Sequence, residues 1–82
     1  MKENWRKIEQ YNIEVSNIGR IKNNGKIVKL IRKNDYYIYL NVNVGEWVAF
    51  AFLNFERNIN TIEYKNGKTI DNRIENIIIK WI

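Results

Sequence analysis

The most regular alternation of apolar and polar residues runs from Tyr36 to Val44 and predicts a β-strand. One side of this strand is aliphatic and is expected to face the core: Ile38, Leu40, Val42 and Val44. The opposite side carries two phenol rings and two amides: Tyr37, Tyr39, Asn41 and Asn43. Such a surface can stack on nucleic-acid bases or meet a protein partner. Cross-strand pairing of tyrosines is favourable in any sheet, so the pattern leaves both interpretations open.

Shorter strands joined by turns are expected earlier in the chain. Alternation predicts strands at Tyr11–Ser16, Arg20–Lys22 and Lys26–Arg32. The last of these has ambiguous facing, because its apolar residues are adjacent. Turns are predicted at Asn17–Gly19, Asn23–Gly25 and Lys33–Asp35. Residues 1–10 are too short for a stable helix, so they are expected to plug the end of the sheet.

One helix is expected, at Glu46–Phe55 after Gly45 ends the preceding strand. Trp47, Ala51 and Phe55 recur at four-residue spacing, which places them on one helical face. The segment is almost wholly apolar, so it is expected to be buried against the sheet, and its aromatic residues are interpreted as core. A polar loop follows, at Asn54–Asn60.

In the last segment, Thr61–Ile82, turn residues define the order of the elements. They predict a short strand, a tight turn at Asn66-Gly67, one polar helical turn at Asp71–Glu75 and a closing apolar strand. The run Ile77–Ile79 lacks alternation, and an exposed edge of this kind favours pairing with a second copy. A homodimer is therefore possible.

Together these elements predict an α+β fold in one domain, residues 1–82. A small antiparallel meander packs on one buried helix, and a ββα-like unit closes the chain. An 82-residue chain has a thin core and no room for a deep substrate cavity.

Charge adds a candidate partner. The net charge is +5, and no acidic residue lies between Glu14 and Asp35. Six cations occupy that interval: Arg20, Lys22, Lys26, Lys29, Arg32 and Lys33. A block of one sign predicts contact with a polyanion, although a solvated face that keeps a small protein soluble is the simpler alternative.

The residues that are missing exclude several classes of site. The chain has no Cys and no His, so a structural zinc site is not expected, and no cofactor is predicted. The lack of Cys fits a cytoplasmic protein. No apolar run approaches the roughly 20 residues that span a bilayer, so no membrane partner is expected.

Three motifs resemble the HNH homing endonucleases of phages and mobile elements. The segment YNIEVSNIGRIKN at Tyr11–Asn23 is similar to the NUMOD-type motif with its "VSN-GR" core. The segment GEWVAFAFLNF at Gly45–Phe55 is similar to the HNH helix. The segment NGKTIDNRIEN at Asn66–Asn76 resembles the stretch that follows the catalytic His. The resemblance divides the chain into a NUMOD-like meander, residues 1–44, and a degenerate HNH-like unit, residues 45–82.

The departures from this family fall on its chemistry. The resemblance implies a general-base His where this chain has Tyr64, and a phenol with a pKa of about 10 cannot take that role near neutral pH. Glu63 alone is a poor metal site. A second His is replaced by Gly45, and the sequence ends at Ile82, whereas the family continues into a helix with the remaining metal ligand. No catalytic or metal-binding residue is therefore assigned, and an active nuclease is disfavoured.

Two functions remain open. The first is a non-catalytic module that binds nucleic acid, DNA rather than RNA by the resemblance, through the six cations. The second is an anti-CRISPR-like counter-defence inhibitor that binds a host nuclease or its guide-RNA complex, in the host cytosol if the protein is phage-encoded. The candidate partner-binding residues are Tyr37, Tyr39, Asn41, Tyr64 and Trp81.

Three positions of the HNH-like unit have a structural alternative. Tyr64 either contacts a phosphate or base, or fills the space that a metal would occupy, and the second interpretation is preferred. Asn72 and Asn76 are interpreted as residues that cap and brace a turn.

Overall fold

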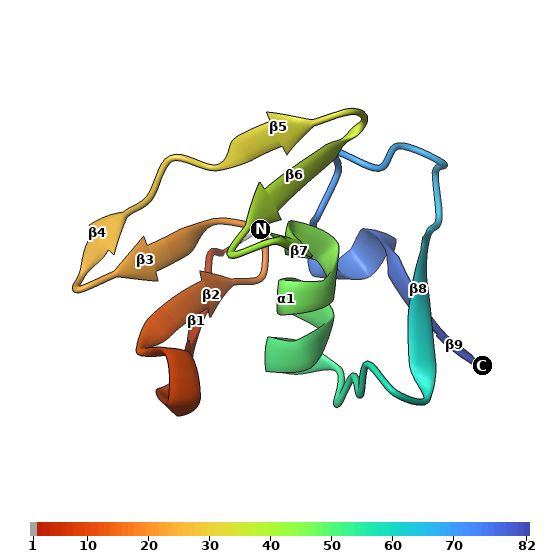
Figure 1. The fold of residues 1–82 in the computed structure, drawn as a ribbon, viewed down its shortest axis with the longest axis horizontal. Coiled ribbons are helices and arrows are strands. Elements are labelled where there is room, and N and C mark those ends of the chain that lie inside the picture. Colours follow the sequence, from red (N-terminus) through yellow and green to blue (C-terminus); the bar gives the residue numbers. More distant parts are fainter. Residues whose placement is uncertain (1) are drawn as a thin grey trace.

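The structure, a computed structural model, describes residues 2–82 and has an α+β fold, with one α-helix packed on antiparallel strands (Figure 1). The strands form three small sheets. The first contains β1 (Trp5–Ile8), β2 (Ile13–Ser16), β3 (Ile21–Asn23) and β4 (Lys26–Ile27). The second contains β5 (Ile31–Lys33), β6 (Tyr36–Tyr39) and β7 (Val42–Asn43). The third contains β8 (Asn60–Tyr64) and β9 (Ile77–Trp81). The helix is α1 (Val44–Phe52), and two 3-10 turns, η1 (Glu9–Tyr11) and η2 (Ile74–Asn76), complete the elements.

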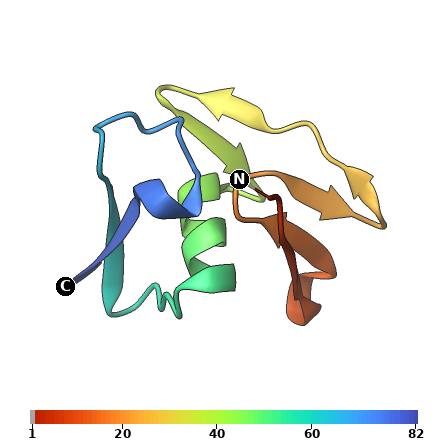
Figure 2. The ribbon, with the colours of Figure 1, turned by 180° about the vertical axis from the view of Figure 1, so that it is seen from behind.

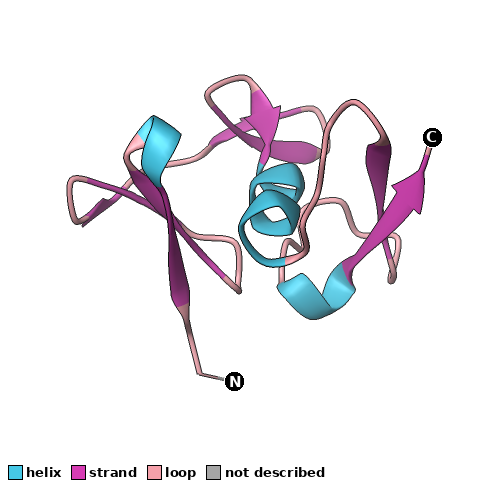
Figure 3. Ribbon diagram, turned by 90° about the horizontal axis from the view of Figure 1, so that it is seen from below, coloured by secondary structure: helices cyan, strands magenta, loops and turns pink. Residues whose placement is uncertain are grey.

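Helix α1 lies at the centre, with the three sheets around it (Figure 3). Seen from behind, the β8–β9 pair and the loop above it lie on one side of α1 and the first sheet lies on the other (Figure 2). Two buried clusters meet the helix. The larger consists of Ile8, Ile13, Val15, Ile21, Val44, Trp47 and Val48, and the smaller of Ala49, Phe55 and Ile77. Because α1 contributes to both clusters, it connects the first sheet to the β8–β9 pair.

The first sheet confirms most of the predicted strands and adds one. Ile13 and Val15 of β2 are fully buried, as their alternation indicates, while Tyr11 is exposed at the end of η1. The expectation of an N-terminal plug is wrong, because residues 5–8 form β1 and pair antiparallel with β2. This pairing buries Ile8 opposite Ile13.

The predicted strand Lys26–Arg32 is wrong in its continuity. It is divided into β4 and β5, which belong to different sheets. Between them Val28 and Leu30 turn towards the larger cluster and pack against it. Val28 and Leu30 are among the apolar residues that made the facing of the predicted strand ambiguous, and the strand is interrupted where they pack on the core.

The predicted strand Tyr36–Val44 is also wrong in its extent, because it is interrupted by a turn and ends before helix α1. Its expected core face is confirmed only in part, since Val42 and Val44 belong to the larger cluster while Leu40 does not. Leu40 and Asn41 have φ angles of 51° and 61°, which form a two-residue turn between β6 and β7. Tyr37 and Tyr39 pack against the larger cluster, and Leu40 points to solvent. A phenol ring buries more apolar surface than Ile or Leu, so a thin core favours the tyrosine side inward.

The C-terminal half follows the prediction closely. The helix begins at Val44, two residues before the expected Glu46, and ends at Phe52, three residues before the expected Phe55. Phe55 is buried as expected, but it lies beyond the end of the helix. The order of strand, turn, short helical turn and strand is confirmed, with the helical turn at Ile74–Asn76. Strand β9 pairs with β8 along its whole length. None of the helices within residues 2–82 has the length and apolar character needed to cross a membrane.

Candidate nucleic-acid interface and the groove beside Tyr64

Four of the predicted cations lie on one extended segment, which we call the basic edge: Lys26, Lys29, Arg32 and Lys33. All four are exposed. Strands β4 and β5 are the outer strands of their sheets, so the segment follows the upper edge of the molecule (Figure 1). In the part of the chain that the structure describes, no carboxylate forms an ion pair with any of them. Their charges are therefore available to an anionic partner, although edge lysines also discourage strands from pairing.

The outer face of the second sheet carries part of this charge beside apolar side chains. Ile31 pairs with Ile38 and Lys33 pairs with Tyr36, so these residues share that face. A shallow hollow of about 560 Å³ lies here, lined by Lys29, Ile31, Lys33, Ile38, Tyr39, Leu40 and Asn41. The lining combines two cations with exposed aliphatic groups and contains no carboxylate.

Arg20 and Lys22 are not part of the basic edge, although Lys22 lies on β3, which pairs with β4. Both cations contact residues at the N-terminus of the chain. The Arg20 guanidinium donates to both carboxylate oxygens of Glu3, with Nε 2.9 Å from Oε2. This hydrogen bonding holds the pKa of the Glu3 carboxyl below its usual range. Both cations also lie over the Trp5 ring, Arg20 at 5.8 Å and Lys22 at 4.1 Å from the centroid. Their geometry is that of structural contacts.

The predicted partner-binding residues are not gathered on one surface. The prediction that Tyr37 and Tyr39 are exposed is wrong, since both are half-buried against the core. The Tyr39 carbonyl also accepts a hydrogen bond of 2.8 Å from the indole nitrogen of Trp47. Asn41 is exposed in the β6–β7 turn. Trp81, at the end of β9, is 76% exposed.

Tyr64 lies in a groove between β8 and the start of α1, lined by Tyr36, Asn43, Glu46, Thr61, Ile62, Glu63, Tyr64, Gly67 and Thr69. A Cβ placed on Gly45 would be 2.4 Å from the Tyr64 hydroxyl oxygen, so the ring occupies the space that any larger residue at 45 would need. The hydroxyl is buried and has no hydrogen-bond partner among the described residues. Burial, with smaller contributions from Tyr36 and Glu46, raises the pKa of Tyr64 to about 12. This geometry favours the space-filling interpretation.

The carboxylates of the groove already have cationic partners. Glu46 Oε1 is 3.1 Å from Arg57 Nε, and Glu63 Oε1 is 3.5 Å from Lys80 Nζ. Within residues 2–82, no three His, Cys, Asp or Glu side chains gather closely enough to hold a metal ion. The groove thus presents an uncharged phenol flanked by two carboxylates that each form an ion pair.

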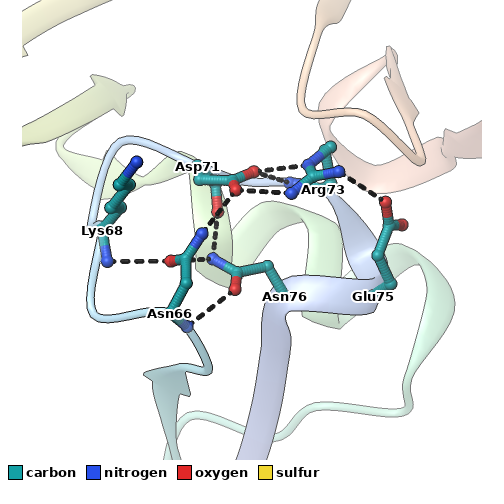
Figure 4. A network of polar contacts seen from close by, with 6 residues as sticks. All are labelled: Asn66, Lys68, Asp71, Arg73, Glu75 and Asn76. Carbon is teal, nitrogen blue, oxygen red and sulfur yellow. Dashed lines mark hydrogen bonds and ion pairs between the residues drawn. The ribbon is translucent and has the colours of Figure 1, made fainter.

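A network of amides braces the loop between β8 and β9 (Figure 4). The buried Asn76 side chain accepts a hydrogen bond of 3.0 Å from the Asn66 backbone N–H and donates to the Asn66 side-chain oxygen at 3.0 Å. It also donates to the Asp71 carbonyl at 2.9 Å. Asn66 Oδ1 in turn accepts from the Lys68 backbone N–H at 2.9 Å. Asn76 therefore holds the turn, which agrees with its structural interpretation.

An exposed ion-pair chain continues this network. The Arg73 guanidinium donates to both oxygens of Asp71, at 2.8 and 2.7 Å, and lies 3.2 Å from Glu75. These hydrogen bonds hold the pKa of Asp71 well below its usual range. Arg73 is thus occupied within its own loop.

The "VSN-GR" segment joins the two ends of the chain. The Asn17 side chain accepts from the Asn4 backbone N–H at 2.7 Å and donates to the Lys2 carbonyl at 3.1 Å. The Asn17 carbonyl accepts from the Ile74 N–H at 2.8 Å. Gly19 has a φ of 93°, and a Cβ there would be 2.8 Å from the Cβ of the buried Asn72. The motif therefore docks the first hairpin against the C-terminal loop.

Sequence reasoning missed the exposed aliphatic residues beside the basic edge. Ile31 is 69% exposed, and Leu40, expected in the core, is 57% exposed. The local signal was Asn41, because Asn accepts a positive φ readily and marks a possible turn in the middle of the alternating segment.

Comparison with models of protein families, with curated proteins and with solved structures finds no match to this chain.

Proposed function

We propose that this protein is a non-catalytic, HNH-like module that binds nucleic acid, DNA in preference to RNA, through the basic edge. The observation that carries the proposal is the arrangement of Lys26, Lys29, Arg32 and Lys33 along one extended segment, where all four are exposed and none forms an ion pair with a residue in the range 2–82. Extended spacing of cations suits successive phosphates of a nucleic-acid backbone. The preference for DNA rests on the resemblance to HNH homing endonucleases.

The groove supports binding rather than hydrolysis. Tyr64 stands where the family has its base, and its buried hydroxyl has a pKa raised to about 12, so it holds its proton at neutral pH. Gly45 leaves the space that the Tyr64 ring fills. Such a site is suited to binding the nucleic-acid backbone without cleaving it.

Salt dependence tests the proposal. We expect the wild type to bind a random duplex with a logarithmic affinity that falls steeply with the logarithm of salt concentration. The variant Lys26→Gln, Lys29→Gln, Arg32→Gln should lose about 0.9 in this slope per phosphate contact, or about 2.7 for three contacts. These side chains are exposed, so the fold should be unaffected.

A matched control separates the basic edge from net charge. Lys2, Lys7 and Lys65 are also exposed and have no ion pair within the described residues. Changing these three to Gln alters the net charge equally and should leave most of the slope. Equal loss in both triple variants, or no duplex binding by the wild type at low salt, contradicts the proposal.

The second candidate function is the counter-defence inhibitor, and exposed Trp81 favours it. Large aromatic side chains are the usual anchors of protein interfaces. Trp81 is 76% exposed, and its neighbour Ile82 bonds through its backbone N–H to the carbonyl of Ile59, which is also exposed. Under this hypothesis the triple Gln variant of the basic edge still binds a host nuclease, and the Trp81→Ala variant does not. Capture that tolerates Trp81→Ala counts against it.

A further inference from the structure

Leu40 is in an unfavourable backbone conformation and is exposed. Its φ of 51° lies in the left-handed region, and its side chain is 57% exposed at the tip of the β6–β7 turn. Gly, Asn and Asp are the usual residues at such a turn position, because a branched side chain is strained there. An aliphatic residue that strains its own turn and buries little surface points to a contact outside the chain.

The surroundings of Leu40 indicate what that contact is. Lys29 and Leu40 both line the hollow on the outer face of the second sheet. Lys33 lines the same hollow, and Asn41 follows Leu40 in the turn. The tip therefore combines an aliphatic wedge, an amide and flanking cations, with no carboxylate in the lining.

We propose that the β6–β7 turn enters the minor groove of duplex DNA, with Leu40 inserted between adjacent base pairs, so that binding bends the DNA. This inference rests on the proposed function and specifies its mode. Minor-groove proteins commonly insert Leu, Ile or other apolar wedges between base steps, unstack them partly and kink the duplex. Lys29 and Lys33 contact the phosphates on the outer side of the hairpin, and Asn41 reaches the acceptor groups on the floor of the groove.

A protein partner is the competing occupant of this tip. The cations favour DNA, because β5 pairs with β6 and the hollow beside the turn is lined by Lys29 and Lys33 of the basic edge. An aliphatic tip without nearby cations would not favour DNA over a protein partner.

Ring closure of a short duplex tests the inference without knowledge of a binding sequence. A fragment of about 120 bp is shorter than the persistence length of DNA, about 150 bp, and therefore closes slowly under ligase. We expect wild-type protein to raise the rate of minicircle formation on the order of tenfold, because a kink brings the ends together.

The informative variant is Leu40→Asn. It relieves the strained φ, so its melting temperature should rise by about 4 °C. It keeps every cation, so its salt slope should match that of the wild type. It removes the wedge, so the gain in ring closure should disappear. The control Ile59→Asn changes an exposed aliphatic residue in a distant loop and should retain the gain.

The outcomes separate the two levels of the proposal. If Leu40→Asn accelerates ring closure as well as the wild type does, the wedge is overturned while DNA binding stands. If the wild type binds with a steep salt slope but gives no gain in ring closure, the wedge is likewise overturned, and Leu40 serves another surface such as a protein partner. If the wild type binds no duplex, the proposed function itself fails.

Discussion

The contact between Gly45 and Tyr64 makes a specific prediction about stability. A methyl group at residue 45 would lie 2.4 Å from the Tyr64 hydroxyl oxygen, 2.8 Å from Ile62 Cδ1 and 3.0 Å from Tyr64 Cζ. Real Cβ contacts are essentially never this short, so Gly45→Ala forces the ring or the strand to move. Tyr64→Phe removes the closest of the three atoms and nothing else.

The expected free energies follow from these distances. Overpacking of a close contact costs about 1–3 kcal/mol, and Ala at a helical position returns less than about 1 kcal/mol in the first turn, so Gly45→Ala should lose about 2 kcal/mol of unfolding free energy. Tyr64→Phe removes a buried hydroxyl that has no hydrogen-bond partner within the described part of the chain, so it should raise the unfolding free energy by about 1 kcal/mol. In the Phe background the Ala substitution should cost only about 1 kcal/mol, because the flexible end of Ile62 can turn away.

Urea unfolding of the four proteins in this double-mutant cycle measures the coupling. A domain of this size has a denaturant slope of about 1 kcal/mol per molar urea, so the single Ala variant should unfold at a midpoint about 2 M lower than the wild type. Tyr36→Phe is the control, since Tyr36 lines the same groove and its hydroxyl is not among the buried unpartnered atoms. It should change the midpoint little.

Two results would refute this reasoning. If Gly45→Ala is equally destabilising in the Tyr and Phe backgrounds, the hydroxyl is not the group that fills the space. If Tyr64→Phe lowers the stability by about 1 kcal/mol or more, the hydroxyl has a hydrogen-bond partner in solution.

Three further predictions concern the loop network, the docked hairpin and the pH range. Asn76→Ala removes three partly buried hydrogen bonds and should lower the unfolding free energy by about 3 kcal/mol, measured by thermal unfolding, whereas Asn58→Ala, at an exposed residue, should cost almost nothing. Gly19→Ala should prevent stable folding, measured by circular dichroism, because its Cβ would strike a neighbour, whereas Gly25→Ala, with open space around it, should cost only about 1–2 kcal/mol. Burial raises the pKa of Tyr64 to about 12, so the stability from its neutral form is complete below about pH 10 and is lost as the pH rises to about 12; the wild type should weaken relative to Tyr64→Phe across that window.

Local chemistry made several elements predictable. The Asn-Gly pairs at Asn24-Gly25 and Asn66-Gly67 both mark turns. Asn24, Gly25 and Gly67 have a positive φ, whereas Asn66 supports its turn through its side-chain oxygen, which accepts from the Lys68 backbone N–H. The alternation of Ile13 and Val15 gave the buried face of β2, because the strand has no competing apolar side. The order of elements after residue 60 followed from the same signals.

The candidate site was harder to predict, because it depends on which side of a strand packs against the core and which side faces solvent. At Tyr36–Val44 both sides carry groups that can be buried, and only packing against α1 decides between Tyr39 and Ile38. The choice also depends on the turn at Leu40, which local propensity disfavours. The isolation of Arg20 from the basic edge likewise depends on Glu3 and Trp5, which reach it only through the pairing of β1 with β2.

The loop between β8 and β9 touches both N-terminal sheets at their turns. The Ile74 N–H donates to the Asn17 carbonyl, and the Thr69 hydroxyl donates to the Asp35 carbonyl. A proteolytic nick in the exposed stretch Glu56–Ile59 would thus leave two pieces that remain joined by these hydrogen bonds. Neither piece contains a complete hydrophobic core. Helix α1 would remain in the first piece, while the smaller cluster that packs on α1 requires Ile77 from the second. Such a chain is suited to fragment complementation, with each peptide unfolded alone and the pair regaining structure when mixed.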